Sequence, residues 1–139
     1  MDAGLYDGGR FHRTVRREPD NQPQNTVKIE VVQAGANSAR AIEFFTPIAL
    51  ERTSVTGLTH ADGVISMARA QPNTGRDQFF ICIGNQPELD FGGKRNPDGQ
   101  GFAAFGRVIG GMPVVRKIQA SPANGQTLTP PIRIVRVVR

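Results

Sequence analysis

Residues 63–83 constrain the fold of this chain more than any other stretch of it. An apolar run at 64–67 is followed by a polar segment with Pro, Asn and Gly at 72–75, and a second apolar run occupies 79–83. Two apolar runs separated by turn-forming residues predict two short strands joined by a long loop of small residues. The two strands would bring three side chains to one surface: Met67, Gln78 and Phe80. The alternative is an ordinary hairpin whose loop carries no function.

Other segments add strands and one helix to this pair. Strands are also predicted at 11–15, 27–33, 102–109 and 131–139, and loops at 16–25, 34–62 (with a turn of helix near Leu50) and 84–101. In the first strand, Phe11, Arg13 and Val15 would share a face because successive residues alternate. Pro113 suits the first turn of a short helix near 113–119. Many short strands and one late helix favour a small, mainly β structure, an antiparallel β-barrel.

Composition narrows the class of protein. With 139 residues, 38% hydrophobic residues, 16 Gly and 10 Pro, the chain suits a single strand-rich domain over 1–139 rather than a helical bundle. A single cysteine, Cys82, excludes an internal disulfide and is predicted to be a small buried hydrophobe. The net charge of +5 comes from scattered basic residues, so a solvated cationic surface is expected rather than nucleic-acid binding. No apolar run approaches the roughly 20 residues of a membrane-spanning helix, so no membrane partner is expected.

The order S-M-A-x-A-x-P-N-T-x-x-x-Q-F-F-I over residues 66–81 closely resembles the cyclophilin family of peptidyl-prolyl isomerases. Matching segments extend the resemblance from about Gly4 to the C-terminus: G-L-Y-D-G at 4–8, F-H-R at 11–13, V-V-Q-A-G at 31–35, L-D at 89–90, G-F-A-A-F-G-R-V at 101–108 and G-M-P-V-V at 111–115. The resemblance implies a closed eight-stranded barrel with a proline-binding groove on its outer face. It also implies a peptidyl-prolyl cis-trans isomerase that assists protein folding by accelerating rotation about X-Pro bonds.

The resemblance assigns roles to individual residues. Arg13 would be the catalytic residue, because a planar and permanently charged guanidinium can donate to the imide nitrogen as the bond twists. Gln33 would hydrogen-bond the substrate backbone, and Gln78 would orient the substrate. The other predicted substrate-binding residues are Val31, Met67, Phe80, Leu89 and Phe102 in the proline pocket, and Ala68, Arg69, Ala70 and Gln71 on a rim that contacts residues before the proline. Outside this context, a strand arginine is usually an ion-pair partner and such apolar residues are plain core.

Three departures from the family pattern affect these expectations. The family begins with two strands and a helix before the segment equivalent to Gly4, so we expect either an internal start at Met1 or an N-terminally truncated, incomplete barrel with exposed edges. Residues 14–28 form an insertion, which a surface loop can accommodate. Glu30 falls where the family has an aromatic pocket residue, and Glu88 where a tryptophan often sits. Weaker binding of the proline ring is therefore expected.

The predicted partners are proline-containing peptides and unfolded proteins, with a cyclosporin-like compound as the small-molecule class for the groove. No cofactor, metal or nucleic acid is predicted, and His12 and His60 have neither metal-ligand spacing nor a neighbouring nucleophile in the sequence. Two rival interpretations stay open, a non-catalytic proline-peptide binding module and an inactive fragment. The N-terminus has no hydrophobic signal core, so the expected location is cytoplasmic by default, and periplasmic if a longer precursor carries a signal peptide.

Overall fold

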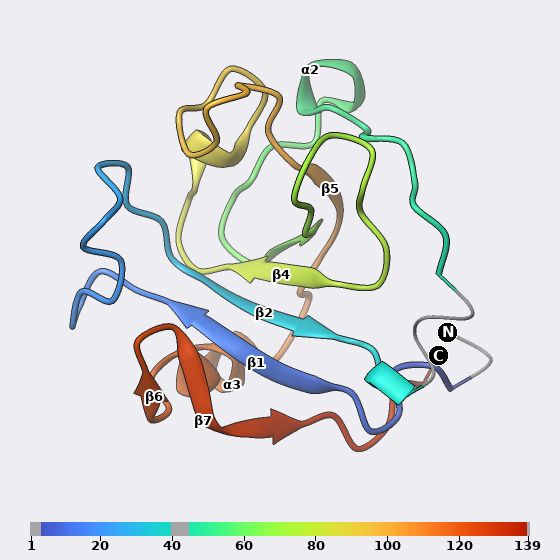
Figure 1. Ribbon diagram of the computed structural model, residues 1–139, viewed down its shortest axis with the longest axis vertical. Helices are drawn as coiled ribbons and strands as arrows, with labels where there is room; N and C mark the ends of the chain where they lie inside the picture. Colours follow the sequence, from blue (N-terminus) through green and yellow to red (C-terminus); the bar gives the residue numbers. More distant parts are fainter. Residues whose placement is uncertain (1–3, 40–44, 139) are drawn as a thin grey trace.

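The structure, a computed structural model, describes residues 4–39 and 45–138. In chain order the elements are β1 (Arg10–Val15), β2 (Val31–Gly35), α2 (Thr53–Thr56), β3 (Val64–Met67), β4 (Phe79–Cys82), the 3-10 helix η1 (Pro87–Leu89), β5 (Ala103–Arg107), α3 (Met112–Gln119), β6 (Ala123–Asn124) and β7 (Thr127–Arg133). The strands form one antiparallel sheet in the order β5-β3-β4-β2-β1-β7-β6, and it is not closed (Figure 1). The mainly β class and the helix near 113–119 are confirmed. Within the described residues the sheet has seven strands, where a closed barrel of eight was implied.

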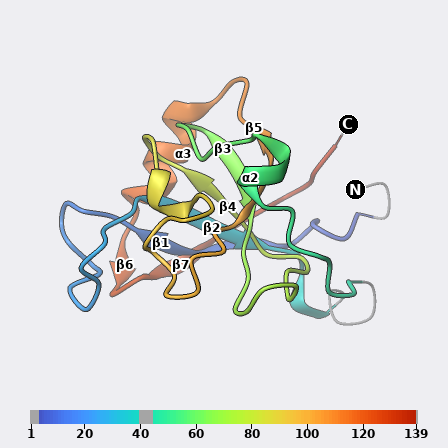
Figure 2. The ribbon, with the colours of Figure 1, turned by 90° about the horizontal axis from the view of Figure 1, so that it is seen from above.

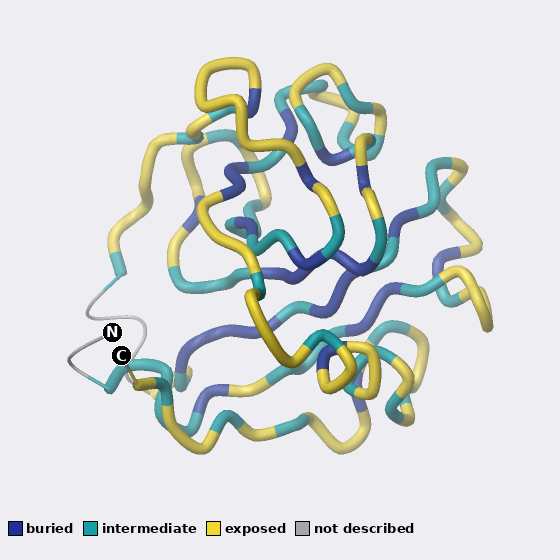
Figure 3. The backbone as a smooth tube through the Cα atoms, turned by 180° about the vertical axis from the view of Figure 1, so that it is seen from behind, coloured by how far each residue is buried: buried dark blue, intermediate teal, exposed yellow. Residues whose placement is uncertain are grey.

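Each face of the sheet carries its own apolar core. Helix α3 covers one face and buries Val115 against Val32 and Ile81, and Figure 2 shows the helix along one side of β1 and β2. The other face carries a second buried cluster, which consists of Val15, Ile29, Val31, Phe80, Cys82 and Leu89. Figure 3 shows these buried segments at the centre of the molecule, with exposed loops around them. The predicted burial of Cys82 is confirmed.

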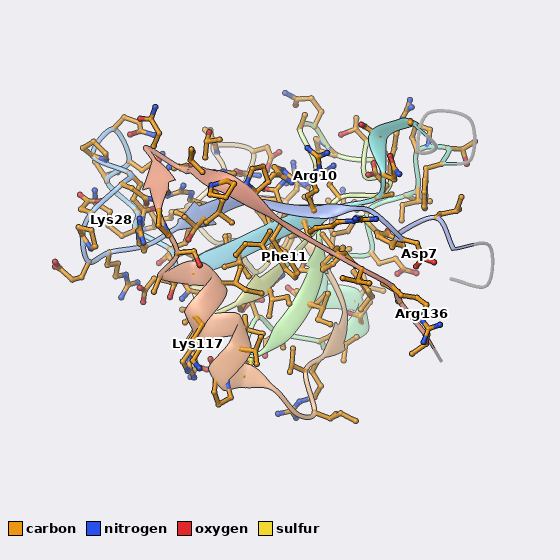
Figure 4. The ribbon with its side chains drawn as sticks, turned by 90° about the horizontal axis from the view of Figure 1, so that it is seen from below. Asp7, Arg10, Phe11, Lys28, Lys117 and Arg136 are labelled. Carbon is orange, nitrogen blue, oxygen red and sulfur yellow. The ribbon has the colours of Figure 1, made fainter. Side chains whose placement is uncertain are left out.

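A β-bulge in β1 turns Arg13 to the face opposite Phe11. The pairing of β1 with β2 and with β7 shifts between these two residues. Phe11 packs against the cluster beneath α3, and Figure 4 shows Arg10 on the other side of the strand. The prediction that Phe11 and Arg13 share a face is therefore wrong. A bulge adds one residue to a strand and re-aims the side chains beyond it, and bulges are common beside active sites.

The strand predicted at 27–33 begins only at Val31. Before it, the side-chain amide of Gln22 replaces a neighbouring strand: its Nε2 donates to the carbonyl of Ile29 at 2.7 Å, and its Oε1 accepts from the Ile29 N–H at 3.2 Å. Gln22 is fully buried in this position. Local side-chain hydrogen bonds of this kind satisfy a backbone that the sheet does not reach.

Other boundaries differ by a few residues. The helical turn expected near Leu50 begins at Thr53, and the closing strand predicted at 131–139 is β7, which starts earlier and ends at Arg133. Residues 40–44 of the predicted 34–62 loop, and Arg139, lie outside the described residues. None of the helices in the described ranges has the length and apolar character needed to cross a membrane.

Candidate active site

A cavity of about 450 Å³ opens on the face of the sheet that Arg13 faces. It collects ten of the residues predicted for the site: Arg13, Val31, Gln33, Ala68, Arg69, Ala70, Gln78, Phe80, Leu89 and Phe102. These come from β1, β2, the 68–78 loop between β3 and β4, β4 itself, η1 and the residue just before β5. Residues up to 89 positions apart in the chain therefore meet around one cavity.

Two predicted residues do not line this cavity. Met67 pairs with Phe79 and Ala103, and its side chain packs so closely on Gly75 that a Cβ there would contact it. Gln71 is exposed on the outer part of the 68–78 loop. The placement of Met67 in the proline pocket is wrong in this structure, because the alternation along β3 directs Ser66, not Met67, toward the face of Phe80.

The apolar part of the cavity is built around Phe80. The ring of Phe102 meets the ring of Phe80 edge to face, with centroids 5.3 Å apart, and Leu89 is almost completely buried beside them. Aromatic pairs in this geometry are stabilising and hold each other in orientation. Together with Val31, these side chains form a firm apolar hollow large enough for a small ring.

Ile29, not Glu30, completes that hollow. Ile29 lines the cavity and is buried, whereas the Glu30 carboxylate turns toward the backbone N–H of Arg17 and the amide of Gln119. Glu30 therefore does not enter the hollow as expected. The residue that does is aliphatic, so the loss of an aromatic wall and the weaker binding of the proline ring stay predictions. Glu88 likewise accepts a hydrogen bond from the Lys94 N–H and does not line the cavity.

Arg13 is held at the polar edge of the hollow by two amides. Its Nε donates to Oε1 of Gln126 and its Nη1 donates to Oε1 of Gln33, both at 2.9 Å. Gln33 in turn donates to Gln78 Oε1 at 3.3 Å, and Gln126 donates to the carbonyl of Asn21 at 3.1 Å. Each amide therefore presents its oxygen to the guanidinium and uses its NH₂ group elsewhere, which keeps the arginine in one orientation.

The charge of Arg13 is not neutralised by this arrangement. No carboxylate of the described residues forms an ion pair with it, and no hydrogen bond within the described residues uses its second terminal nitrogen, Nη2. Burial lowers the pKa of Arg13 from its ordinary value because desolvation disfavours the charged form. An arginine nevertheless stays protonated at neutral pH. A partly desolvated cation with a free donor thus faces the cavity.

Arg69 has a supporting position on the rim. Its guanidinium binds both carboxylate oxygens of Asp98, at 2.9 and 3.1 Å, and donates to the carbonyl of Gly101. It also lies 5.0 Å from the centre of the Phe102 ring. Arg69 therefore connects the 68–78 loop to the 91–101 loop through these hydrogen bonds, and its guanidinium lies over the Phe102 ring.

His60 supports the hollow from behind through a Ser-His-Asp group that the sequence did not reveal. Its Nδ1 lies 2.6 Å from Asp90 Oδ1 and its Nε2 lies 2.8 Å from Ser66 Oγ, and its ring stacks on Phe80 with centroids 6.0 Å apart. This geometry resembles that of a hydrolytic triad. However, Ser66 is 0% exposed and His60 is 2% exposed, so no substrate reaches the hydroxyl. The group joins β3, η1 and β4 and has a structural role.

Comparison with known proteins places this chain in a family. The sequence matches the family described as "Cyclophilin type peptidyl-prolyl cis-trans isomerase/CLD" over residues 1–139. The chain belongs to the cyclophilin family. The human "Peptidyl-prolyl cis-trans isomerase-like 3" is 38% identical over 131 residues, which cover 92% of this chain and 68% of that protein. "Peptidyl-prolyl cis-trans isomerase A" of Dickeya dadantii is 30% identical over 119 residues, or 85% of this chain and 54% of that protein.

Solved cyclophilins share the fold. A Cryptosporidium parvum cyclophilin type peptidyl-prolyl cis-trans isomerase, crystallised in the presence of the dipeptide Ala-Pro, superposes with a TM-score of 0.68 at 21% sequence identity. The match covers 97% of this chain and 76% of the solved chain. Because the identity is low, this likeness bears on the fold of the chain and not on its substrate.

Several cavity residues were missed by sequence reasoning. Besides Ile29 these are Thr74, Arg76, Asp77, Arg95 and Asn96. Those at 74–77 lie inside the recognised stretch and could have been included as neighbours of Gln78. Arg95 and Asn96 belong to a glycine-rich loop whose path depends on distant contacts, so no local pattern pointed to them. Groups of three or more His, Cys, Asp or Glu suited to hold a metal ion are absent from the described part of this cyclophilin-family chain.

Proposed function

We propose that this chain accelerates cis-trans rotation about X-Pro peptide bonds, with the cavity holding the proline and Arg13 acting on the twisting bond. The proposal is supported above all by the free Nη2 donor of Arg13, which stands at the edge of an apolar hollow formed by Phe80, Leu89 and Phe102. Family membership sets the class of reaction. We assign the roles of the individual residues from their positions.

The reaction needs no bond to be broken. Delocalisation of the nitrogen lone pair gives the peptide bond partial double-bond character, with a barrier of about 18–20 kcal/mol. X-Pro bonds are the ones with a substantial cis population, so they are the useful substrates. Uncatalysed exchange takes roughly 10–100 s, which is slow enough to limit folding. An enzyme has to hold the ring and stabilise the twisted amide.

The hollow and the polar edge divide these two tasks. The apolar side chains bind the proline ring and fix its nitrogen, while the preceding carbonyl group swings. In the twisted state the lone pair is no longer delocalised, so the nitrogen becomes a better hydrogen-bond acceptor. A donor fixed beside it therefore binds the twisted state more tightly than the planar one, and only such differential binding raises the rate. Gln33 and Gln126 keep the Arg13 donor in place, so little reorganisation is needed.

The amides of Gln33 and Gln78 serve the substrate backbone. They lie at the end of the cavity next to the 68–78 loop and are linked by a hydrogen bond of 3.3 Å. We assign the residues preceding the proline to this end, along Ala68 and Ala70. Partners of this protein are then flexible or unfolded chains that can present an extended X-Pro segment.

The experiment compares Arg13→Ala with Arg10→Ala. Both arginines lie on β1, but Arg10 is exposed and does not line the cavity. Isomerisation of a proline tetrapeptide should slow by about 10²–10³-fold in Arg13→Ala, the usual effect of removing one preorganised donor, while Arg10→Ala should match the wild type. Equal rates in Arg13→Ala and wild type would remove the mechanism. Binding of the peptide without acceleration by the wild type would support the rival function, a proline-peptide binding module.

A further inference from the structure

The cavity contains more positive charge than a proline ring requires. Four arginines line it, whereas Asp77 is the only acidic residue among its lining side chains in the described ranges. Arg69 is compensated by Asp98. Arg13, Arg76 and Arg95 form no ion pair with any described carboxylate.

Arg95 is built into its position by the insertion between β1 and β2. Its Nη1 donates to Oε1 of the buried Gln22 at 2.9 Å and to the carbonyl of Val27 at 2.6 Å. Hydrogen bonds within the described residues leave Nε and Nη2 of Arg95 unused. The side chain is thus anchored by one nitrogen and offers its other donors to the cavity that it lines.

Arg95 and Arg13 face the same space without a counter-charge. Partial burial lowers the pKa of Arg95, and repulsion from the Arg13 guanidinium lowers it further. The acidic side chains nearby have other partners. Asp77, which lines the cavity, accepts hydrogen bonds from the Ala36 N–H and the Gln78 amide. Glu88 binds the Lys94 N–H, and Glu30 lies near Arg17 and Gln119. An anion placed between the two guanidinium groups would relieve their repulsion and bind both.

The position of Arg95 identifies which part of a substrate meets it. In the register of β2 and β4, Gln33 lies opposite Phe80, and Val31 lies opposite Cys82. The 68–78 loop with Gln78 is therefore at one end of the cavity, and Ile29 and Arg95 are at the other. If residues before the proline run along the 68–78 loop, as the proposed function has it, the chain after the proline runs toward Arg95.

We propose that this site prefers substrates with a carboxylate just after the proline, bound by Arg95 together with Arg13. The inference rests on the proposed function for the direction of the substrate. The carboxylate has two sources, an Asp or Glu side chain at the residue following the proline, or the free C-terminus of a chain that ends in proline. Both present the same planar anion, which a guanidinium binds through two parallel hydrogen bonds.

The test measures turnover and binding of matched peptides by the full chain. One pair is acetyl-Ala-Ala-Pro-Glu-amide against acetyl-Ala-Ala-Pro-Gln-amide, which isolates the side chain. A second pair is acetyl-Ala-Ala-Pro with a free or an amidated C-terminus, which isolates the chain end. A third pair, acetyl-Ala-Glu-Pro-Ala-amide and its Gln counterpart, places the charge before the proline. Each pair is run with wild type, Arg95→Gln, Arg95→Lys and the exposed β5 control Arg107→Gln.

We expect wild type to favour the carboxylate member of the first or second pair by about five- to tenfold in kcat/KM, as for a partly desolvated charge pair. The preference should shrink with added salt. It should fall to about one in Arg95→Gln, persist in part in Arg95→Lys, and be unchanged in Arg107→Gln. Using the ratio within a pair removes any general effect of a variant on folding or rate.

Three results would overturn the inference: no preference in wild type for either the first or the second pair, a preference that survives Arg95→Gln, or a preference confined to the third pair. The proposed function is tested separately by turnover of the uncharged peptides. If none is turned over, the same ratios are measured as dissociation constants. A carboxylate preference that depends on Arg95 then upholds the binding inference although the catalytic proposal fails, and equal dissociation constants or no binding overturn it.

Discussion

Replacing His60 with leucine tests whether the buried Ser-His-Asp group holds the hollow together. The substitution removes the contacts of the ring with Asp90 at 2.6 Å and with Ser66 at 2.8 Å. A hydrogen bond to a charged group contributes about 1.5–3 kcal/mol, and an orphaned buried hydroxyl costs about 1–3 kcal/mol. We therefore expect His60→Leu to lower the free energy of unfolding by about 3–5 kcal/mol, a large part of the 5–15 kcal/mol typical of a domain.

The sharper part of this prediction is a change of sign at Ser66. In the wild type, Ser66→Ala removes the hydrogen-bond partner of His60 Nε2 and should destabilise the protein by about 1 kcal/mol or more. In the His60→Leu background the same change removes an unsatisfied buried hydroxyl, so it should restore about 1 kcal/mol. Such opposite effects are a coupling between neighbours, which a double-mutant cycle measures directly.

The assay is equilibrium unfolding in urea for the four proteins of the cycle, with His12→Leu as control. His12 lies on β1 and its ring makes one exposed contact, so its replacement should change stability by less than about 0.5 kcal/mol. If Ser66→Ala destabilises both backgrounds equally, the two side chains are not coupled and the reasoning fails. A loss of less than 1 kcal/mol in His60→Leu, the low end of the orphaned-hydroxyl cost, would also contradict it.

Three further predictions use other features of the structure. Burial lowers the pKa of His60, although Asp90 opposes the shift, so the unfolded chain takes up a proton at higher pH than the folded chain does. The urea concentration at the midpoint of unfolding should therefore fall as the pH drops below about 6.5, and it should fall less in His60→Gln. A Cβ at Gly9 would strike the backbone of Gly35, whereas one at Gly35 would strike only the end of the Gln78 side chain. Gly9→Ala should therefore lower thermal stability markedly, while Gly35→Ala should leave a normal melt and impair turnover, and equal melts would refute this. Burial raises the pKa of Cys82 to about 12, so a thiol reagent at pH 8 should modify it only after unfolding in urea; rapid labelling of the native chain would contradict that burial.

The recognisable part of the fold was the part encoded by local patterns. The strands around 64–67 and 79–82 and the helix from Met112 follow from apolar runs and from a proline at the first turn. The family resemblance, over 66–81 and the matching segments at 11–13, 31–35, 89–90 and 101–108, then brought most cavity residues together in advance. These features depend on neighbours in the sequence, which is why a sequence alone predicts them.

What the sequence did not predict depends on long-range contacts. The bulge beyond Phe11 leaves no trace in an alternating pattern, yet it decides that Arg13 faces the cavity. Ile29 replaces Glu30 in the hollow because Gln22 binds the Ile29 backbone from within the insertion. The same glutamine accepts a hydrogen bond from Arg95, which lies 73 residues further along the chain. The role of His60 likewise depends on tertiary contacts, with Ser66 of β3 and with Asp90 at the end of η1.

The most direct test of the account is the rate of cis-trans exchange in a bound proline peptide that carries no carboxylate, measured by NMR at saturation for wild type and Arg13→Gln. The variant keeps a polar, hydrogen-bonding side chain, but this side chain is shorter and lacks the cation. We expect exchange to slow by about 10²–10³-fold while the dissociation constant changes by less than threefold, because the guanidinium acts on the twisted amide and not on the planar one. Exchange at the wild-type rate in Arg13→Gln, or a loss of binding that accounts for the whole effect, would contradict the account.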